Sequence, residues 1–434
     1  MKMKRITTRP PSRGNLPSFI FTILRNPSRG FHSDAVNANP TCTHTIKRTH
    51  LVSESMIQTR CKSGKIRKDE ALGYFNSMIQ TKPLPSIWTF NCLLGALSKM
   101  KQYSAVVSMC KQLMGYAHFG PDVSTMTIFM NCLCRLNRVD LGFPVLAITL
   151  KYGLQPNAYS MNTLLHGLCK ESRMDDALTL FRDMISKSVV PDIISYNTLI
   201  HGLCNMSRWE EVLPLFEGME DHGVRPDVVT YTTLIYALCR SGRLEKAKSF
   251  LVCMLNSGIS PDVYTYNVLM NTLCKEERIQ EALTLLETMT TKGIKPNVVT
   301  FNSLISASCK SGNWEEAVML FKTMIDHGVL PDIVTYNSVL DALCKEGKTT
   351  EALNLVNEMF RRGEKPDVVT YSSLIKGLCR TSQWKEATRL FDEMVCHGIL
   401  PNFITLKILS GALCNEVMTD EVREEFKARI DGAL

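Results

Sequence analysis

Small polar side chains recur at two positions of the sequence with a period of 35 residues, apart from one interval of 36. The first set contains only Asn, Thr and Ser, namely Asn91, Thr127, Asn162, Asn197, Thr232, Asn267, Asn302, Asn337 and Ser372. The second set contains only Asp and Asn, namely Asp122, Asn157, Asp192, Asp227, Asp262, Asn297, Asp332, Asp367 and Asn402. Short amides, hydroxyls and carboxylates are groups that can exchange hydrogen bonds with the edge of a nucleobase.

The second set has an alternative interpretation as helix caps. Each of its members follows a proline, and Asp or Asn at this place can satisfy the free N–H groups that begin a helix. Capping does not explain the first set, because Asn, Thr and Ser are mediocre helix formers and here lie between apolar positions. We therefore expect the first set to line an exposed groove, with the second set beside it.

A row of cations follows each member of the first set by eight residues. Its members are Lys99, Arg135, Lys170, Arg240, Lys275, Lys310, Lys345 and Arg380, whereas Asn205 takes this place once. A cation at a helix C-terminus stabilises the helix dipole by ~0.3–1 kcal/mol. The same row could instead bind the phosphates of a nucleic acid, and the two roles are compatible.

The elements that must position these side chains are seen most clearly in residues 228–262. Val229, Tyr231, Leu234, Ile235 and Leu238 fall three and four residues apart, which predicts one face of a first helix. After the Ser-Gly turn at 241–242, the apolar residues at 244, 247, 251 and 254 predict a second helix that ends at Gly258. A pair of this size cannot bury both faces alone, so it must stack on copies of itself.

The copies are present throughout the chain. Cysteines recur in register at Cys134, Cys169, Cys204, Cys239, Cys274, Cys309, Cys344, Cys379 and Cys414. Methionines recur in the second helix from Met184 to Met394, and prolines recur from Pro121 to Pro401. Regular spacing of this kind excludes an ordinary globular domain and predicts a helical repeat array.

The repeat resembles the pentatricopeptide repeat of organelle RNA-binding proteins, over about residues 51–434. The clearest matches are DIVTYNSVLDALCKEGKTTEA, from Asp332 to Ala352, and DVVTYSSLIKGLCRTSQWKEA, from Asp367 to Ala387. The motif HGLC, which ends at Cys169 and again at Cys204, is similar to that of the restorer-of-fertility-like subgroup. The resemblance implies an all-α, right-handed superhelical solenoid of helix-turn-helix repeats that binds single-stranded RNA, one base per repeat.

In that family the fifth and last residues of a repeat choose the base, and the residue at the second position sandwiches it. The two polar sets occupy the fifth and last positions of nine repeats, which span 87–122, 123–157, 158–192, 193–227, 228–262, 263–297, 298–332, 333–367 and 368–402. The second positions hold Trp88, Ser124, Tyr159, Ile194, Val229, Tyr264, Val299, Val334 and Val369. Carried over to these pairs, the family rules imply the target core 5′-UAUUG(C/U)UUA-3′. Ser124 departs from the apolar pattern and weakens repeat two.

The segments outside these nine repeats differ in composition. Residues 1–33 hold seven of the basic residues and no acidic one, which leaves +1 of the formal net charge of +8 for the rest. This Arg-rich, acid-free composition predicts a mitochondrial transit peptide, with a chloroplast leader or a basic tail as alternatives. We expect a linker over 34–50, a degenerate repeat over 51–86, and an incomplete repeat or cap over 403–434, with a charged helix from Thr419 to Arg429.

Other chemistry finds little support. Sixteen cysteines suggest disulfides or zinc, but equivalent residues in stacked helices lie about 8–10 Å apart, beyond reach of a disulfide. Nothing resembles the His-x-Glu and Cys-x-x-Cys motifs of a zinc deaminase, so we expect no enzyme, metal or cofactor. The expected partner is single-stranded organelle RNA, with a separate nuclease as a candidate second partner, no membrane, and a monomeric chain. Two alternatives remain: a protein-binding scaffold like the tetratricopeptide repeat, whose period is 34, and a truncated, inactive relative.

Overall fold

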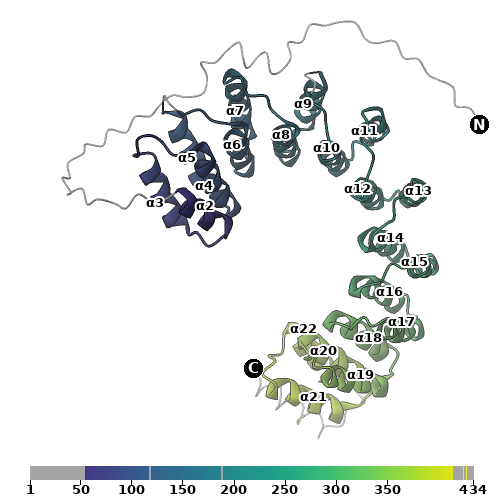
Figure 1. The fold of residues 1–434 in the computed structure, drawn as a ribbon. Helices are drawn as coiled ribbons and strands as arrows, with labels where there is room; N and C mark the ends of the chain where they lie inside the picture. The colour runs from purple at the N-terminus through teal and green to yellow at the C-terminus, as the bar shows by residue number, and fades with distance from the viewer. Residues whose placement is uncertain (1–53, 117–118, 187–188, 414–423, 425–426, 428–434) are drawn as a thin grey trace, which may run out of the picture. The chain divides into compact units, whose positions relative to one another are not determined.

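The computed structural model describes residues 54–116, 119–186 and 189–413, together with Glu424 and Lys427. These residues form 21 helices and no strand, so the predicted all-α class is confirmed (Figure 1). The chain divides into two compact units, Met1–Pro226 and Asp227–Leu434. The predicted leader and linker lie outside the described residues, as do Cys414 and most of the predicted helix from Thr419 to Arg429.

The helices alternate between the first and the second helix of a repeat. The first helices are α2 (Glu54–Lys62), α4 (Ile87–Lys99), α6 (Val123–Arg135), α8 (Ala158–Lys170), α10 (Ile193–Asn205), α12 (Val228–Arg240), α14 (Val263–Lys275), α16 (Val298–Lys310), α18 (Ile333–Lys345), α20 (Val368–Arg380) and α22 (Phe403–Leu413). The second helices are α3 (Lys68–Met78), α5 (Tyr103–Met114), α7 (Val139–Lys151), α9 (Met174–Ser186), α11 (Trp209–Asp221), α13 (Leu244–Asn256), α15 (Ile279–Thr291), α17 (Trp314–Asp326), α19 (Thr349–Arg361) and α21 (Trp384–Cys396).

Within each unit, a first helix packs against its own second helix and against the first helices of the neighbouring repeats. In the second unit α16 contacts α17, α14 and α18, and in the first unit α6 contacts α7, α4 and α8. This is the predicted helix-turn-helix stack. It places the first helices side by side, so that residues at the same position of successive repeats form rows.

Residues 228–262 form the expected pair, α12 and α13. Gly242 and Gly258 have φ of +69° and +73°, which a residue without a Cβ adopts readily, and they end the two helices. The core of the pair includes Leu234, Ile235, Ala247 and Met254, each fully buried. The prediction for Val229 is corrected, because this side chain is 57% exposed and lies off the buried face.

The repeating cysteines are packing residues. All fourteen cysteines among the described residues are free, and Cys134, Cys204, Cys239 and Cys344 are buried. Burial raises the pKa of Cys344 to about 12, so its thiol is protonated and unreactive at neutral pH. A Cβ on Gly377 would lie 2.6 Å from the Cβ of Cys344, which shows how closely neighbouring first helices approach there.

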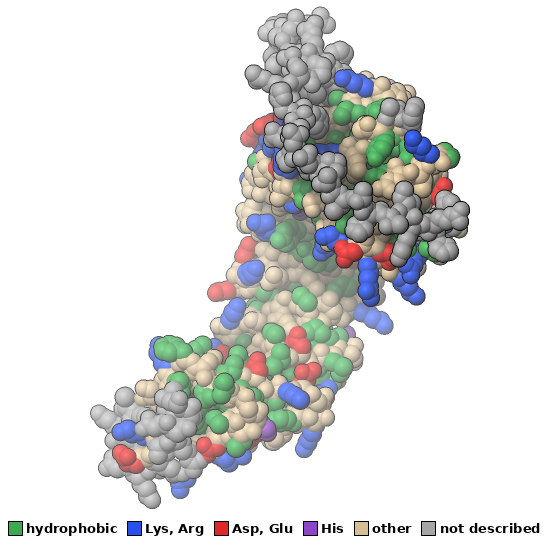
Figure 2. Space-filling model, turned by 90° about the vertical axis from the view of Figure 1, so that its left-hand side faces the viewer, with side chains coloured by type: hydrophobic (Ala, Val, Ile, Leu, Met, Phe, Trp, Pro, Cys, Tyr) green, Lys and Arg blue, Asp and Glu red, His purple; other side chains and the backbone are tan. Residues whose placement is uncertain are grey.

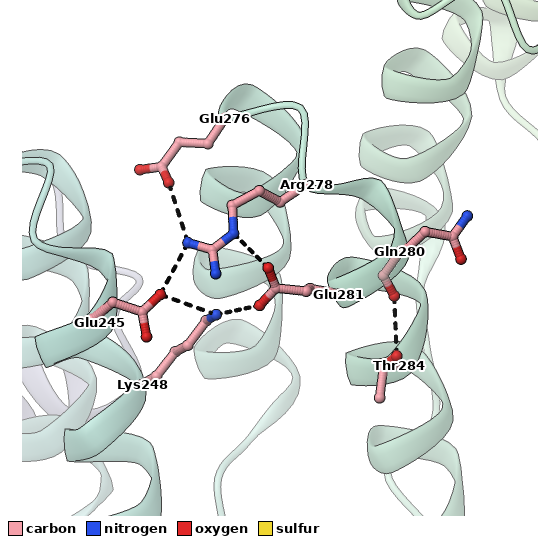
Figure 3. Close-up of polar contacts among 7 residues, drawn as sticks. All are labelled: Glu245, Lys248, Glu276, Arg278, Gln280, Glu281 and Thr284. Atoms are coloured by element: carbon pink, nitrogen blue, oxygen red, sulfur yellow. Dashed lines mark hydrogen bonds and ion pairs between the residues drawn. The ribbon is translucent and has the colours of Figure 1, made fainter.

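Ion pairs join second helices along the outer layer of the stack. Arg278, just before α15, contacts Glu245 of α13 at 2.9 Å and Glu281 of its own helix at 2.5 Å (Figure 3). Lys248 of α13 also pairs with Glu281. Hydrogen bonds from Arg278 and Lys248 lower the pKa of Glu281 to about 2. Glu245 and Glu281 are exposed, and Lys248 and Arg278 are half-buried, so this cluster lies at the surface and supports the stack.

Candidate nucleic-acid interface

The last residue of each repeat caps the first helix of the next repeat. The side chain of Asp332 accepts a hydrogen bond from the backbone N–H of Thr335 at 2.9 Å, and the Oδ1 of Asn157 accepts one from Ser160 at 2.9 Å. The other caps are Asp122, Asp192, Asp227, Asp262, Asn297, Asp367 and Asn402. Capping uses one of the two polar side-chain atoms. Outside the cap it leaves Oδ2 of an Asp, an acceptor, or Nδ2 of an Asn, a donor. In Asp122 this Oδ2 also accepts from Asn91 Nδ2 at 3.0 Å.

The fifth residue lies beneath the surface and contacts the last residue of its own repeat. Asn302 Nδ2 donates to Asp332 Oδ1 at 3.1 Å, in the same arrangement as four other Asn-bearing repeats. These are Asn91 with Asp122, Asn162 with Asp192, Asn267 with Asn297, and Asn337 with Asp367, at 2.8–3.1 Å. The expectation that the fifth residues lie on an exposed groove face is wrong for most repeats. Most are buried, including Thr232 at 7% exposure, because the next repeat packs over them.

Hydroxyl residues at the fifth position make different contacts. Thr232 shares a 2.7 Å hydrogen bond with Thr265, the third residue of the next repeat. Ser372 does the same with Thr405 and also donates to the carbonyl of Val368, in its own helix, at 2.6 Å. Thr127 instead donates to the carbonyl of Val123, in its own helix, at 2.7 Å. These hydroxyls do not bond directly to the capping residue, because they are shorter than an Asn amide.

The residue at the third position of the next repeat was not singled out from the sequence. It is Ser or Thr in every repeat and buried throughout, at Thr125, Ser160, Ser195, Thr230, Thr265, Thr300, Thr335, Thr370 and Thr405. Thr335 Oγ1 lies 2.6 Å from Asn302 Oδ1 and 2.9 Å from Asp332 Oδ1. The sequence did carry a signal for this residue, because the third position holds only Ser or Thr. This restriction is as regular as the restriction of the fifth position to Asn, Thr and Ser.

The second-position residues form an exposed row, as expected of groups that sandwich a base. The apolar side chains in this row are 49–65% exposed. They are Trp88, Tyr159, Ile194, Val229, Tyr264, Val299, Val334 and Val369. Ser124 is also exposed. Large apolar side chains at such exposure are not part of the core, so they are free to contact a ligand.

All three predicted positions meet at one hollow in the first unit. This hollow has a volume of about 200 Å³ and lies between the first helices of repeats two and three. Thr127 and Asn157, the fifth and last residues of repeat two, lie in its wall together with Ser124 and Tyr159, the second residues of repeats two and three. A larger cavity of about 560 Å³ borders α7, α8 and α9 and is lined mainly by apolar residues such as Leu146 and Met184.

Hydrogen bonds hold three of the capping carboxylates, those of Asp192, Asp332 and Asp367, in their charged form. Burial raises the pKa of Asp332, but hydrogen bonds from the Thr335 backbone and the Asn302 amide outweigh this effect, so its pKa is lower than that of a free Asp. The pKa values of Asp192 and Asp367 are lowered in the same way. At neutral pH these side chains are therefore acceptors only.

The predicted cations all lie in the last turns of first helices. Their environments differ, because Lys345 pairs with Asp341 at 2.7 Å and Arg240 lies over the ring of Tyr236 at 5.9 Å. On the face drawn in Figure 2, basic and acidic side chains are interspersed, with no large patch of one sign. Both the helix-dipole and the phosphate interpretation fit these positions.

A metal centre and a membrane-spanning helix are both absent from the described part of the chain. No group of three or more His, Cys, Asp and Glu side chains there could hold a metal ion. No described helix is long and apolar enough to cross a membrane.

Comparison with known proteins agrees with the repeat pattern. The model of the PPR repeat family matches eight times, at residues 121–170, 156–205, 191–240, 226–275, 265–310, 296–345, 331–380 and 374–415. A mitochondrial pentatricopeptide repeat-containing protein of Arabidopsis thaliana is 38% identical over 101 residues, which are 22% of this chain and 15% of that protein. A second mitochondrial one from the same plant is 41% identical over 90 residues, 20% of this chain and 14% of that protein.

Among solved structures, the chain is similar to the pentatricopeptide repeat protein PPR10 in complex with an 18-nt psaJ RNA element. It is 22% identical, with a TM-score of 0.47, and the match covers 87% of this chain and 60% of that one. Most of the named relatives are mitochondrial. Because the family model matches the chain in register from residue 121 to residue 415, the chain belongs to the PPR repeat family, whose members are the pentatricopeptide repeat proteins.

Proposed function

We propose that this chain binds single-stranded RNA in mitochondria and that each of repeats one to nine contacts one base. The observation that carries the proposal is the hollow of repeat two, whose wall holds the fifth and last residues together with two second-position residues. A flat ligand held there would stack on Tyr159 while its edge faced Thr127 and Asn157. Stacking of a base on an aromatic side chain contributes about 1–3 kcal/mol.

The chemistry of the last position supports base selection. A capping Asp leaves an acceptor, which suits the ring N–H on the Watson–Crick edge of uracil or guanine. A capping Asn leaves a donor, which suits the bare ring nitrogen of adenine or cytosine. In the proposed target 5′-UAUUG(C/U)UUA-3′, U and G fall on the Asp repeats, and A and C fall on the Asn repeats. At the sixth base, the Nδ2 of Asn297 favours C.

The fifth position adds the second contact. An Asn whose Nδ2 faces the capping residue has one N–H left for a base carbonyl, and a Thr or Ser hydroxyl offers a smaller group. The cations at the helix C-termini would bind phosphates and add affinity without selecting a sequence. The proposed RNA contacts are therefore the fifth, last and second positions of each repeat, with the cation row along the backbone.

The wider role follows from the same proposal. Bound RNA would be protected, processed by a separate nuclease, or altered in its translation. The acid-free leader over 1–33 and the mitochondrial relatives support a mitochondrial location. The HGLC motif favours membership of the restorer-of-fertility-like subgroup. We propose the domain layout as a leader over 1–33, a linker over 34–50, a degenerate repeat over 51–86, nine repeats over 87–402 and a final cap over 403–434.

Changing the fifth residue of repeat five tests the proposal. Thr232 and Asp262 should select G, and Thr232→Asn should convert the pair to the Asn–Asp type that selects U. Thr232 is buried, but Asn occupies the same buried place in other repeats, so the fold should tolerate it. A wrong base costs about 1–3 kcal/mol, so the variant should lose roughly 5- to 150-fold for UAUUGUUUA relative to UAUUUUUUA.

Competitive gel shift with the two RNAs measures this reversal. Ser372→Asn is the matched control, because it introduces the same side chain at the fifth position of repeat nine and should leave the ranking at the fifth base unchanged. The proposal fails if wild type and Thr232→Asn rank the two RNAs identically. Absence of binding by a wild-type protein that is helical by circular dichroism would favour a scaffold or an inactive relative.

A further inference from the structure

A buried hydroxyl of the following repeat contacts the fifth-position side chain in most of the array. It belongs to the third residue of the next first helix, which is Ser or Thr in every repeat and at most 2% exposed. Five Asn-bearing repeats show the contact at 2.5–2.7 Å, and the pairs are Thr125 with Asn91, Ser195 with Asn162, Thr300 with Asn267, Thr335 with Asn302, and Thr370 with Asn337.

The contacts around Asn302 leave one orientation for its amide. The Asp332 carboxylate can only accept, so it must face Asn302 Nδ2, which lies 3.1 Å from Asp332 Oδ1. The other end of the amide, Oδ1, lies 2.6 Å from Thr335 Oγ1 and accepts its hydroxyl proton. Thr335 Oγ1 in turn accepts the backbone N–H of Asp332 at 3.2 Å. The hydroxyl also lies 2.9 Å from Asp332 Oδ1, so its one proton faces two acceptors, whereas the amide of Asn302 has a single compatible orientation.

Hydroxyl residues at the fifth position are connected through the same group. Thr265 Oγ1 bonds Thr232 Oγ1 at 2.7 Å and lies 2.9 Å from Asp262 Oδ1, so it links the fifth and last residues of repeat five through hydrogen bonds. In repeat nine, Thr405 of α22 lies 2.7 Å from Ser372 and 3.1 Å from Asn402. The incomplete tenth repeat therefore supplies the group that completes the contacts of repeat nine.

We propose that the third-position hydroxyl of the following repeat is a positioning residue for base selection, an inference that rests on the proposed RNA binding. It holds the fifth-position amide with its oxygen inward and its N–H toward the base. Each base is thus selected by three residues of two successive repeats, although only two of them reach the base. The proposal also assigns a purpose to α22, because without it Ser372 would keep its bond to the Val368 carbonyl but lose the hydroxyl that links it to Asn402.

Thr335→Val is the direct test, because it removes the hydroxyl and keeps the shape. The RNAs are UAUUGUUUA and UAUUGUCUA, which differ only at the base assigned to Asn302 and Asp332. Loss of one hydrogen bond to the amide should reduce the U-over-C affinity ratio by about 2- to 12-fold. Thr335→Ser should restore the wild-type ratio, since Ser160 and Ser195 occupy this position naturally.

Two controls separate positioning from stability. Thr388→Val removes the hydroxyl of another buried Thr, which donates to the carbonyl of Trp384 at 2.9 Å in a second helix, and it should leave the ratio unchanged. In an Asn302→Ala background, Thr335→Val should have no further effect on the ratio, because the side chain that it positions is gone. If Thr335→Val loses helicity, Thr370→Val repeats the test at the eighth base. The affinity ratio is then measured between UAUUGUUUA and UAUUGUUCA.

The outcomes distinguish the two proposals. A wild-type protein that binds neither RNA, or binds both equally, overturns the proposed RNA reading and this inference with it. If the wild-type protein prefers U and Thr335→Val keeps the same U-over-C affinity ratio, only the inference about the hydroxyl is overturned. A further fall in the ratio when Thr335→Val is added to Asn302→Ala also overturns it, because the hydroxyl would then act independently of Asn302.

Discussion

Repeats seven and two place the same kinds of residue at the same positions, yet their contacts differ. In repeat seven, Asn302 bonds directly to the capping Asp332 at 3.1 Å, and Thr335 holds the other end of the amide. In repeat two, Thr127 donates to its own helix, at the Val123 carbonyl, while Asn157 caps the next helix separately. A hollow of about 200 Å³ borders Thr127 and Asn157.

The difference follows from the reach of the side chains. An Asn amide is long enough to span from the fifth to the last position, and it carries both a donor and an acceptor to be satisfied there. A Thr hydroxyl is shorter and finds its nearest acceptor one helical turn back. Repeat seven is therefore preorganised before any ligand binds, whereas in repeat two the fifth and last residues are held by separate backbone contacts. Preorganisation favours selectivity, because fewer rearrangements accompany binding.

The largest effect should come from exchanging the atom that the cap leaves free. Asp332→Asn keeps the capping oxygen but replaces an acceptor with a donor, giving the Asn–Asn pair already present at Asn267 and Asn297. The seventh base preference should shift from U toward C by roughly 5- to 150-fold in relative affinity. Competition between UAUUGUUUA and UAUUGUCUA measures this shift.

Stability provides the internal check on Asp332→Asn. Asn and Asp are similar helix caps, so the free energy of unfolding should change by only about 0.5 kcal/mol. Asp367→Asn is the matched variant and should act at the eighth base only. An unchanged preference for U in a folded Asp332→Asn protein would show that the free atom of the cap does not contact the base.

The stack of helix pairs could be predicted from the sequence because its signals are local and repeated. The cysteines and glycines of successive repeats mark the packed faces, and the buried methionines from Met184 to Met394 follow the predicted register. Burial of the fifth position could not be predicted in the same way. Whether a polar residue on a helix is covered depends on how closely the next helix approaches, which sequence spacing alone does not give.

The third-position hydroxyl shows a second limit of the sequence pattern. Ser and Thr near a helix N-terminus are common, so Thr335 on its own indicated only a favourable first turn. Its contact with Asn302, 33 residues earlier, becomes evident when both first helices are placed together. Position-by-position comparison of the repeats could have detected its regularity, but not the partner of the hydroxyl.

A smaller effect should follow from placing a large side chain at the second position of repeat two. Ser124 is the only second-position residue of repeats one to nine without a large side chain. Ser124→Tyr should add one stacking surface and strengthen binding of UAUUGUUUA by about fivefold or more, since stacking contributes about 1–3 kcal/mol per base. Fluorescence anisotropy with labelled RNA measures the affinity. Val369→Tyr, where an apolar side chain is already present, should gain less, and an equal gain in both variants would show that Ser124 does not weaken repeat two.

The smallest effects should come from the cations, which both kinds of repeat share. Phosphates carry no sequence information, so Lys310→Ala should weaken binding to UAUUGUUUA and UAUUGUCUA by the same factor. Each lost phosphate contact should reduce the slope of log affinity against log salt by about 0.7 for a single strand.

Lys345 is the matched comparison, because its charge is already partly neutralised by Asp341 at 2.7 Å. Lys345→Ala should therefore change the slope less than Lys310→Ala does. A salt slope that stays constant in both variants, together with unaltered affinity, would assign this row to helix stabilisation through the dipole and leave base contacts as the whole of the interaction.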